Sequence, residues 1–315
     1  MLAARVRSGL EETFHDGAVA VSDPDGSLVA WSGDIDRPFY LRSSAKPFQS
    51  FVSQVCEAGL EPIELAMASA SHQGHPVQVA LVESILGRVG LTETDLRCPK
   101  DWPSNQAARY RLIRRGEAQP RRVWHNCSGK HAGFLRACVA SDWSTETYLS
   151  PAHPLQQRIV EYVSELGDYP VGPVGVDGCG SPVLRTTTQA MSLLFARLAT
   201  APELSRVFEA MHRYPALVSG NGEGDTAIAT ATNSAAKGGA LGSIGIGLKS
   251  GLGLAVKSWD GLNMMAEVAA VATLDALGQL PGAASEALED VARPSQLGGG
   301  ETRGVAESRL ELKFT

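Results

Sequence analysis

The sequence has few of the features that mark secreted, membrane-bound or nucleic-acid-binding proteins. Its five cysteines are an odd number scattered over 315 residues, which is unlike a secreted disulfide framework and predicts reduced thiols. No apolar run has the length of a signal peptide or a membrane span, so we expect a cytoplasmic protein. The net charge of −6 gives no basic footprint, so neither nucleic acid nor a membrane is an expected partner.

The hydrophobic content of 43% is enough to bury a large core, and we expect a single catalytic domain over residues 1–315. Strand-like segments gather near the two ends of the chain, whereas the middle has helical periodicity. The economical topology is an antiparallel sheet built from N- and C-terminal strands, with helices covering it and a helical insertion. The sequence therefore predicts an α/β (α+β) sandwich. The expected strands are the hairpin 17–33 and the segments 227–235, 240–248, 252–259 and 305–314; the expected helices include 154–167, 192–212 and 263–278; and 294–304 is expected to be a loop.

The stretch RSSAKPFQS, residues 42–50, places two serines just before a lysine and a proline. Pro47 is tolerated only in the first turn of a helix, so the helix is expected to begin near Ser43 or Ser44. Ser43 and Lys46 then lie three residues apart on one face. A lysine with a lowered pKa can take the proton of a serine hydroxyl, which makes Ser-x-x-Lys a possible nucleophile and base. The alternative is a serine cap followed by a solvated lysine.

Two further short motifs follow in the order used by penicillin-recognising serine enzymes, which carry Ser-x-x-Lys, then Ser-x-Asn, then Lys-Thr-Gly. Ser71-His72-Gln73 ends a helical segment, and Lys237-Gly238-Gly239 lies where a strand of the predicted sheet should begin or end. Each match is loose, because a turn serine or a solvated lysine at a strand end would look the same. The ordered set nevertheless favours a serine acyl-transfer enzyme.

Two cysteine-containing segments have no role in that chemistry. HNCSGKHAGFL places Cys127 and Lys130 three apart at the start of a predicted helix, and GVDGCGSPV places Asp177 and Cys179 in a glycine-rich loop. Two thiolates with an amine or a carboxylate can hold Zn²⁺ with one position open. Cys-x-x-Lys is not a standard ligand spacing, and two buried structural cysteines remain the simpler alternative.

The segments RSSAKPFQ, ASHQG, NCSGKHAGFL, DGCGSP and KGGALG, in this order, resemble the asparaginase II family of Rhizobium type, from about Gly17 to the C-terminus. This resemblance implies an enzyme with the serine β-lactamase-like or penicillin-binding fold, usually a homodimer. It also implies that the enzyme hydrolyses L-asparagine to L-aspartate and ammonia, with a zinc ion beside the active site. Matched by motif, two serine–lysine pairs are implied, Ser43 with Lys46 and Ser71 with Lys237. The implied zinc ligands are Cys127, Lys130 and Cys179, and the implied substrate-binding residues are His72, Asp177 and Lys130.

The chain departs from the family pattern at two places. Some relatives carry a cysteine near the metal where this chain has Asp225, and Ala240-Leu241 replaces a more usual alanine–glutamate step. The first departure bears on zinc affinity or on the thiol chemistry of the site, and the motifs predict the class of reaction more firmly than the substrate preference.

The predicted chemistry is attack of Ser43 on the side-chain amide with Lys46 as base, while Ser71 and Lys237 relay a proton to the leaving ammonia. Exchange of the two serines between these roles is the alternative mechanism. Zinc is expected to position the substrate and not to activate water. The alternative functions are a β-lactamase or penicillin-binding activity and a non-catalytic asparagine-binding protein. Lys237-Gly-Gly lacks the hydroxyl of Lys-Thr-Gly, which disfavours the first.

Overall fold

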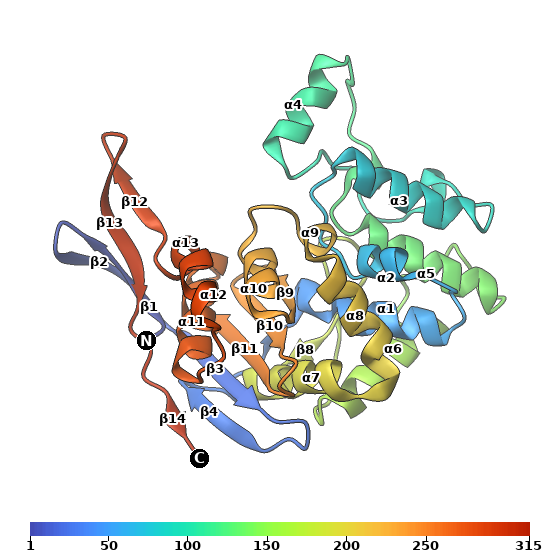
Figure 1. The fold of residues 1–315 in the computed structure, drawn as a ribbon. Coiled ribbons are helices and arrows are strands. Elements are labelled where there is room, and N and C mark those ends of the chain that lie inside the picture. Colours follow the sequence, from blue (N-terminus) through green and yellow to red (C-terminus); the bar gives the residue numbers. More distant parts are fainter.

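The computed structural model describes residues 1–315 and centres on a six-stranded antiparallel sheet (Figure 1). Its strand order is β14-β4-β3-β11-β10-β9, so strands from both ends of the chain lie side by side, as predicted. The hairpin expected at 17–33 is formed by the two strands β3 and β4. The bounds of the six strands are β3 Gly17–Ser22, β4 Leu28–Ser32, β9 Ala235–Gly239, β10 Ser243–Gly247, β11 Gly253–Ser258 and β14 Lys313–Phe314.

A second antiparallel sheet has the order β12-β13-β1-β2 and extends from the body on the side of the N-terminus (Figure 1). Its strands are β1 Ala3–Arg7, β2 Leu10–His15, β12 Ser295–Gly298 and β13 Glu301–Ser308. The prediction of a loop at 294–304 is therefore wrong, because the segment is a hairpin. Gly299 and Gly300 both have positive φ, at 62° and 86°, and make its turn.

Helices cover both faces of the six-stranded sheet. Helix α7, Thr188–Thr200, packs on one face, where Gly245 of β10 leaves room for the Phe195 ring; a Cβ on this glycine would lie 2.0 Å from a ring carbon. Helix α11, Asn263–Ala276, packs on the other face, against the alternating side chains Ile244 and Ile246. The period of two along β10 thus separates the two layers. The predicted sandwich of sheet and helices is confirmed.

The middle of the chain is helical and contributes most of the larger hydrophobic core, of 46 residues, while 22 residues between the sheet and α11 form a second core. The other helices are α1 Lys46–Val55, α2 Pro62–Ala68, α3 Pro76–Gly87, α4 Gln106–Arg114, α5 Ser128–Ala140, α6 Pro154–Leu166, α8 Ser205–Arg213, α9 Pro215–Val218, α10 Gly224–Thr232, α12 Gly282–Ala287 and α13 Glu289–Ala292. Short strand pairs are β5 Phe39–Tyr40 with β8 Arg185–Thr186, and β6 Gly175–Val176 with β7 Pro182–Val183. No helix combines the length and the apolar character needed to cross a membrane.

Three further predicted elements differ from the structure. The segment 305–314 was expected to be one strand, but it contains the end of β13, in the four-stranded sheet, and β14, in the six-stranded sheet. The segment 227–235 was expected to be a strand, but most of it belongs to α10, because its alanines and threonines pack against α11 and α12 instead of pairing with a neighbouring strand. The segment 192–212 was expected to be one helix, but it divides into α7 and α8. Ala201 ends the first helix with an extended backbone, as the following Pro202 requires.

The edge strand β9 lies against η1, the 3₁₀ turn Arg42–Ala45 that precedes α1. This contact is close because Gly239 has no side chain; a Cβ there would lie 2.7 Å from the carbonyl oxygen of Leu41 and 2.8 Å from Ser44 Oγ. The serine motif at 42–46 and the lysine motif at 237–239, almost 200 residues apart in the chain, are therefore brought together.

Candidate functional site

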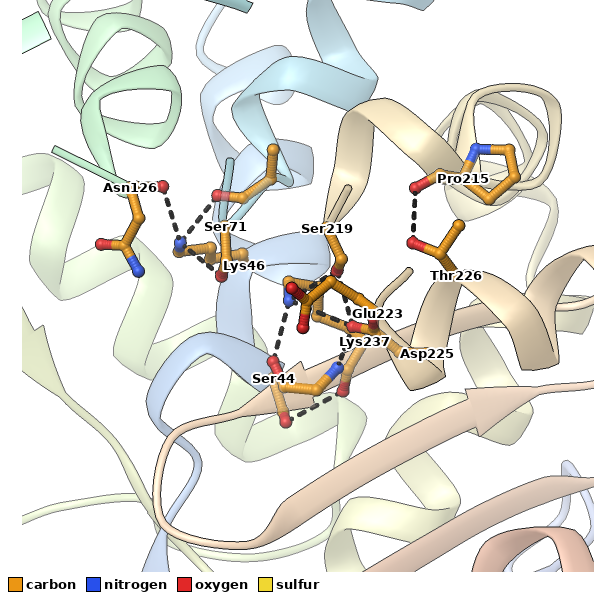
Figure 2. Close-up of polar contacts among 12 residues, drawn as sticks. Ser44, Lys46, Ser71, Asn126, Pro215, Ser219, Glu223, Asp225, Thr226 and Lys237 are labelled. Carbon is orange, nitrogen blue, oxygen red and sulfur yellow. Dashed lines mark hydrogen bonds and ion pairs between the residues drawn. The ribbon is translucent and has the colours of Figure 1, made fainter. Parts of the chain in front are cut away.

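A cavity of about 270 Å³ lies where η1, the loop after α2 and strand β9 meet. Only one of its 14 lining residues is hydrophobic. Ser43, Ser71 and Lys237 line it, so the structure brings three of the four predicted catalytic side chains to one cavity. The fourth, Lys46, is 1% exposed and lies behind Ser71 (Figure 2).

Lys46 is held by acceptors from two other segments of the chain. Its Nζ donates hydrogen bonds to Ser71 Oγ at 2.9 Å and to the carbonyl oxygen of Ala70 at 2.7 Å, and it reaches the carbonyl oxygen of Asn126 at 3.5 Å. Burial lowers the pKa of Lys46 to about 8, and the positive charge of Lys237 acts in the same direction. Near neutral pH a fraction of this amine is therefore unprotonated and able to accept a proton.

Ser43 is half-buried at the cavity, and its hydroxyl makes no hydrogen bond within the chain. The preceding Arg42 has φ 52°, a left-handed conformation that costs a residue other than glycine roughly 1 kcal/mol. Its guanidinium Nε lies 2.8 Å from Asp177 Oδ1, so an ion pair holds the strained turn that presents Ser43. Asp177, predicted to contact substrate, thus contacts Arg42.

Lys237 has different partners from those that the sequence suggested. Its Nζ lies 3.3 Å from Ser219 Oγ and 3.5 Å from Asp225 Oδ2, and it donates a 2.8 Å hydrogen bond to the carbonyl oxygen of Gly238 (Figure 2). The implied pairs were Ser43 with Lys46 and Ser71 with Lys237. In the structure, Lys46 is bonded to Ser71, whereas Lys237 is bonded to Ser219.

Three carboxylates line the cavity and make its wall acidic, namely those of Glu223, Asp225 and Glu267. Glu223 accepts a 2.6 Å hydrogen bond from Gln73 Nε2, whereas Glu267 has no hydrogen-bond partner within the chain. Burial raises the pKa of Glu267 to about 7, and the charges of Asp225 and Glu223 act in the same direction. An unpaired carboxyl group of this kind favours a cationic ligand.

His72, predicted to bind substrate, is fully buried and does not line the cavity. Its Nδ1 accepts a hydrogen bond from the Gly74 amide at 3.1 Å, so Nε2 carries the proton and donates it to Ser128 Oγ at 2.7 Å. Burial lowers the pKa of His72 to about 3. The residue is therefore a neutral link between the loop after α2 and the start of α5.

The three predicted zinc ligands are buried close together at the N-terminus of α5. Lys130 Nζ lies 3.3 Å from Cys179 Sγ. The nearby Cys127 thiol and the charge of Lys130 lower the pKa of Cys179, and the proximity of the two thiols raises the pKa of Cys127. Cys127 also donates to Asn126 Oδ1 at 3.3 Å, and Asn126 lines the cavity. The thiol cluster is thus adjacent to the cavity.

Cys127, Lys130 and Cys179 suit zinc only if the Lys130 amine takes part as a ligand. No three His, Cys, Asp or Glu side chains meet in a group able to hold a metal, so the predicted site depends on the amine of Lys130. Burial alone would lower the pKa of Lys130, but the charges of Cys179, Cys127 and Asp177 raise it. Binding would require Lys130 and the Cys127 thiol to lose their protons, after which two thiolates and one amine form a set with an open position.

Sequence reasoning missed several residues that the structure places at the cavity. Ser219 and Glu223 lie in the glycine-rich segment SGNGEGDT, whose polar composition was the available signal. Glu267 is an acidic residue in the otherwise apolar stretch NMMAEVAAVA, which was a second signal. Asp225 was noted as a departure from the family but not as a contact of Lys237. Ser219, Glu223 and Asp225 lie in the segment from α9 to α10 just before β9, whereas Glu267 lies on α11, so their convergence at the cavity depends on the tertiary structure.

Solved structures resemble the chain at low sequence identity. Mglu in its L-glutamate binding form is 16% identical, has a TM-score of 0.50, and aligns over 86% of this chain and 62% of its own. A β-lactamase from Mycobacterium bovis is 16% identical over 88% of this chain and 95% of its own, with a TM-score of 0.45. A Bacillus glutaminase is 12% identical over 84% and 91%, with a TM-score of 0.40. No curated protein matches the chain. The chain spans less than two thirds of the Mglu chain in that form.

The family is shown by the sequence over nearly the whole length of the chain. The profile of L-asparaginase II matches residues 3–308, which begins earlier than the resemblance seen from the motifs alone and includes the sheet formed by β1, β2, β12 and β13. Ser43, Lys46, Ser71 and Lys237 all fall inside the matched region. The chain therefore belongs to the L-asparaginase II family.

Proposed function

We propose that the protein is an L-asparaginase that hydrolyses the side-chain amide of L-asparagine by a serine–lysine mechanism. Membership of the L-asparaginase II family supports an amidohydrolase, and the choice of substrate and mechanism is our proposal. The observation that carries it is the 2.9 Å hydrogen bond between Lys46 and Ser71 at the wall of a polar cavity. A buried lysine with a pKa of about 8 is suited to act as a base toward a serine.

The proposed first step is transfer of the Ser71 proton to unprotonated Lys46, while Ser71 Oγ attacks the amide carbon. The tetrahedral intermediate then expels ammonia, which takes the proton back from Lys46, and leaves an ester on the serine. Water hydrolyses this ester in a second round of the same proton transfers. We assign the attack to Ser71 because it is bonded to Lys46, and Ser43, the serine preferred from the sequence, is the competing nucleophile tested in the Discussion.

The cavity supports an amino-acid amide as the substrate class. Its volume of about 270 Å³ is suited to a small molecule, and its acidic wall is suited to the α-ammonium group of an amino acid. Glu267 is the proposed partner of this group, because it has no other partner and Glu223 is already bonded to Gln73. Lys237 supplies a positive charge at the same cavity, and this charge can stabilise the substrate carboxylate or a developing oxyanion.

Zinc is part of the proposal. Cys127, Lys130 and Cys179 would hold it, and it would supply a Lewis acid that orients a polar group of the substrate. The convergence of the two thiols and the amine supports this set. We further propose a cytoplasmic homodimer; the five cysteines are all free, which is consistent with a reducing compartment.

Ammonia release separates the candidate functions. The purified protein is incubated with L-asparagine, L-glutamine and a chromogenic β-lactam, and ammonia and ring opening are measured. Turnover of L-asparagine with little opening of the β-lactam supports the proposal. Opening of the β-lactam alone would replace it with a penicillin-type activity, and binding of asparagine without ammonia release would identify a binding protein.

A further inference from the structure

Asp225 is buried at the start of α10, where three donors converge on a single carboxylate oxygen. Its Oδ2 accepts hydrogen bonds from Ser219 Oγ at 2.6 Å and from the Gly238 amide at 2.8 Å, and it lies 3.5 Å from Lys237 Nζ (Figure 2). The first turn of a helix favours a negative charge through the helix dipole. The orientation of this carboxylate is therefore fixed from three directions.

The Lys-Gly-Gly sequence of β9 makes room for this carboxylate. A Cβ on Gly238 would lie 3.1 Å from Asp225 Oδ2, closer than ordinary van der Waals contact. The side chain of a threonine, which the penicillin-type motif carries at this position, would meet the carboxylate. Glycine at 238 and aspartate at 225 are thus spatially matched, since the same glycine also donates its amide to Asp225.

Asp225 is the negatively charged partner of Lys237. Lys237 is 1% exposed, and Asp225 is the only carboxylate with which it forms an ion pair. Glu223 and Glu267 face the same cavity from the segment before α10 and from α11, and Lys46 adds a second cation from α1. Ser219 contacts both members of the pair, because its hydroxyl donates to Asp225 and accepts from Lys237.

We propose that Asp225 is a positioning residue, which holds the Lys237 ammonium at the cavity wall directly and through Ser219, so that Lys237 serves as a fixed cation and Lys46 is the base. The inference rests on the proposed amide hydrolysis at this cavity. It assigns the second lysine a partner that the Ser-x-x-Lys, Ser-x-Gln and Lys-Gly-Gly pattern does not contain. Asp225 acts through Lys237 and does not itself contact the reacting atoms.

A double-mutant cycle in stability tests the ion pair without reference to activity. Asp225→Asn, Lys237→Met and the double variant are unfolded with urea and their midpoints compared with the wild type. Removal of one partner leaves the other as an uncompensated buried charge, so each single variant is expected to lose stability. The double variant is expected to be more stable than the sum of the two losses predicts. Additive losses would overturn the pairing.

A second cycle, in kcat and KM for L-asparagine, tests the positioning role. Asp225→Asn is expected to lower kcat at least about tenfold with a smaller change in KM, because the cation would be misplaced in the transition state. The double variant should be no slower than Lys237→Met alone. Asp225→Glu, which retains the charge, should recover part of the loss, and Thr226→Val, which removes a neighbouring hydrogen bond to Pro215, should keep normal kcat.

The outcomes separate this inference from the proposed function. A wild-type protein that releases no ammonia contradicts the proposed function, and the stability cycle then decides alone whether Asp225 holds Lys237. An active protein in which the losses from Asp225→Asn and Lys237→Met multiply would overturn the positioning role. Ser219→Ala provides a second variant if Asp225→Asn does not fold, with a smaller loss of kcat expected because the direct ion pair remains.

Discussion

The amine of Lys46 and the hydroxyl of Ser71 lie 2.9 Å apart, although 25 residues separate them in the chain. The bond joins the first residue of α1 to the loop after α2, and the amine is fully buried behind the serine. This relationship distinguishes the two serines of the cavity, because Ser43 has no comparable partner.

The first prediction compares these serines. Ser71→Ala is expected to reduce kcat/KM for L-asparagine about 1,000-fold or more, because it removes the hydroxyl that Lys46 activates. Ser43→Ala is expected to cause a smaller loss. Ser53→Ala, a buried serine elsewhere on α1, is the matched control and should be normal. The reverse order of the two losses would identify Ser43 as the nucleophile, and normal turnover by the double variant would exclude a serine mechanism.

The second prediction concerns pH. Burial lowers the pKa of Lys46 to about 8, so the amine is protonated below that pH and becomes a base above it. The value of kcat/KM is therefore expected to rise with pH through about 8. Lys46→Arg should lose activity at every pH, because arginine stays protonated. An activity that is flat from pH 6 to 9 would contradict the role of Lys46 as base.

The third prediction concerns Glu267, whose pKa burial raises to about 7. The carboxylate is charged above this pH and neutral below it, so KM for L-asparagine should rise as the pH falls below about 7. Glu267→Gln should show a raised KM at pH 8, by about tenfold, with no further rise at lower pH, since a charged hydrogen bond is lost. Asp275→Asn, an exposed carboxylate on the same helix, is the control. An unchanged KM in Glu267→Gln would remove this residue from substrate binding.

The fourth prediction concerns the metal. Elemental analysis of the purified protein is expected to find zinc, and Cys179→Ser should lower its content while raising KM more than it lowers kcat. Metal should be lost more readily at low pH, because protons compete for the thiolates and for the Lys130 amine. Cys56→Ser, a buried cysteine in the core beside Arg158, should retain normal metal. If the protein contains no zinc and both Cys127→Ser and Cys179→Ser have normal kinetics, the two residues are structural cysteines of the core.

Much of the fold followed from local sequence patterns. The hairpin predicted at 17–33 is present, with Asp23-Pro24-Asp25-Gly26 between its strands, and the apolar periods predicted α6 and α11 within a residue or two. The errors lay where local pattern and tertiary packing disagree. The alternating alanines and threonines of 227–235 are compatible with either a strand or a helix, and only packing against α11 and α12 selects the helix.

The sequence by itself determined the family and the chemical types at the site, because short motifs such as RSSAKPFQ and NCSGKHAGFL are local and specific. It did not determine which residues are partners. Lys46 meets Ser71 where α1 packs beside α2, whereas Lys237 meets Ser219 and Asp225 where β9 packs beside α9 and α10, with the close approach to Asp225 that Gly238 permits. Pairing depends on distances of a few ångströms between side chains of different elements, and those distances are set by packing.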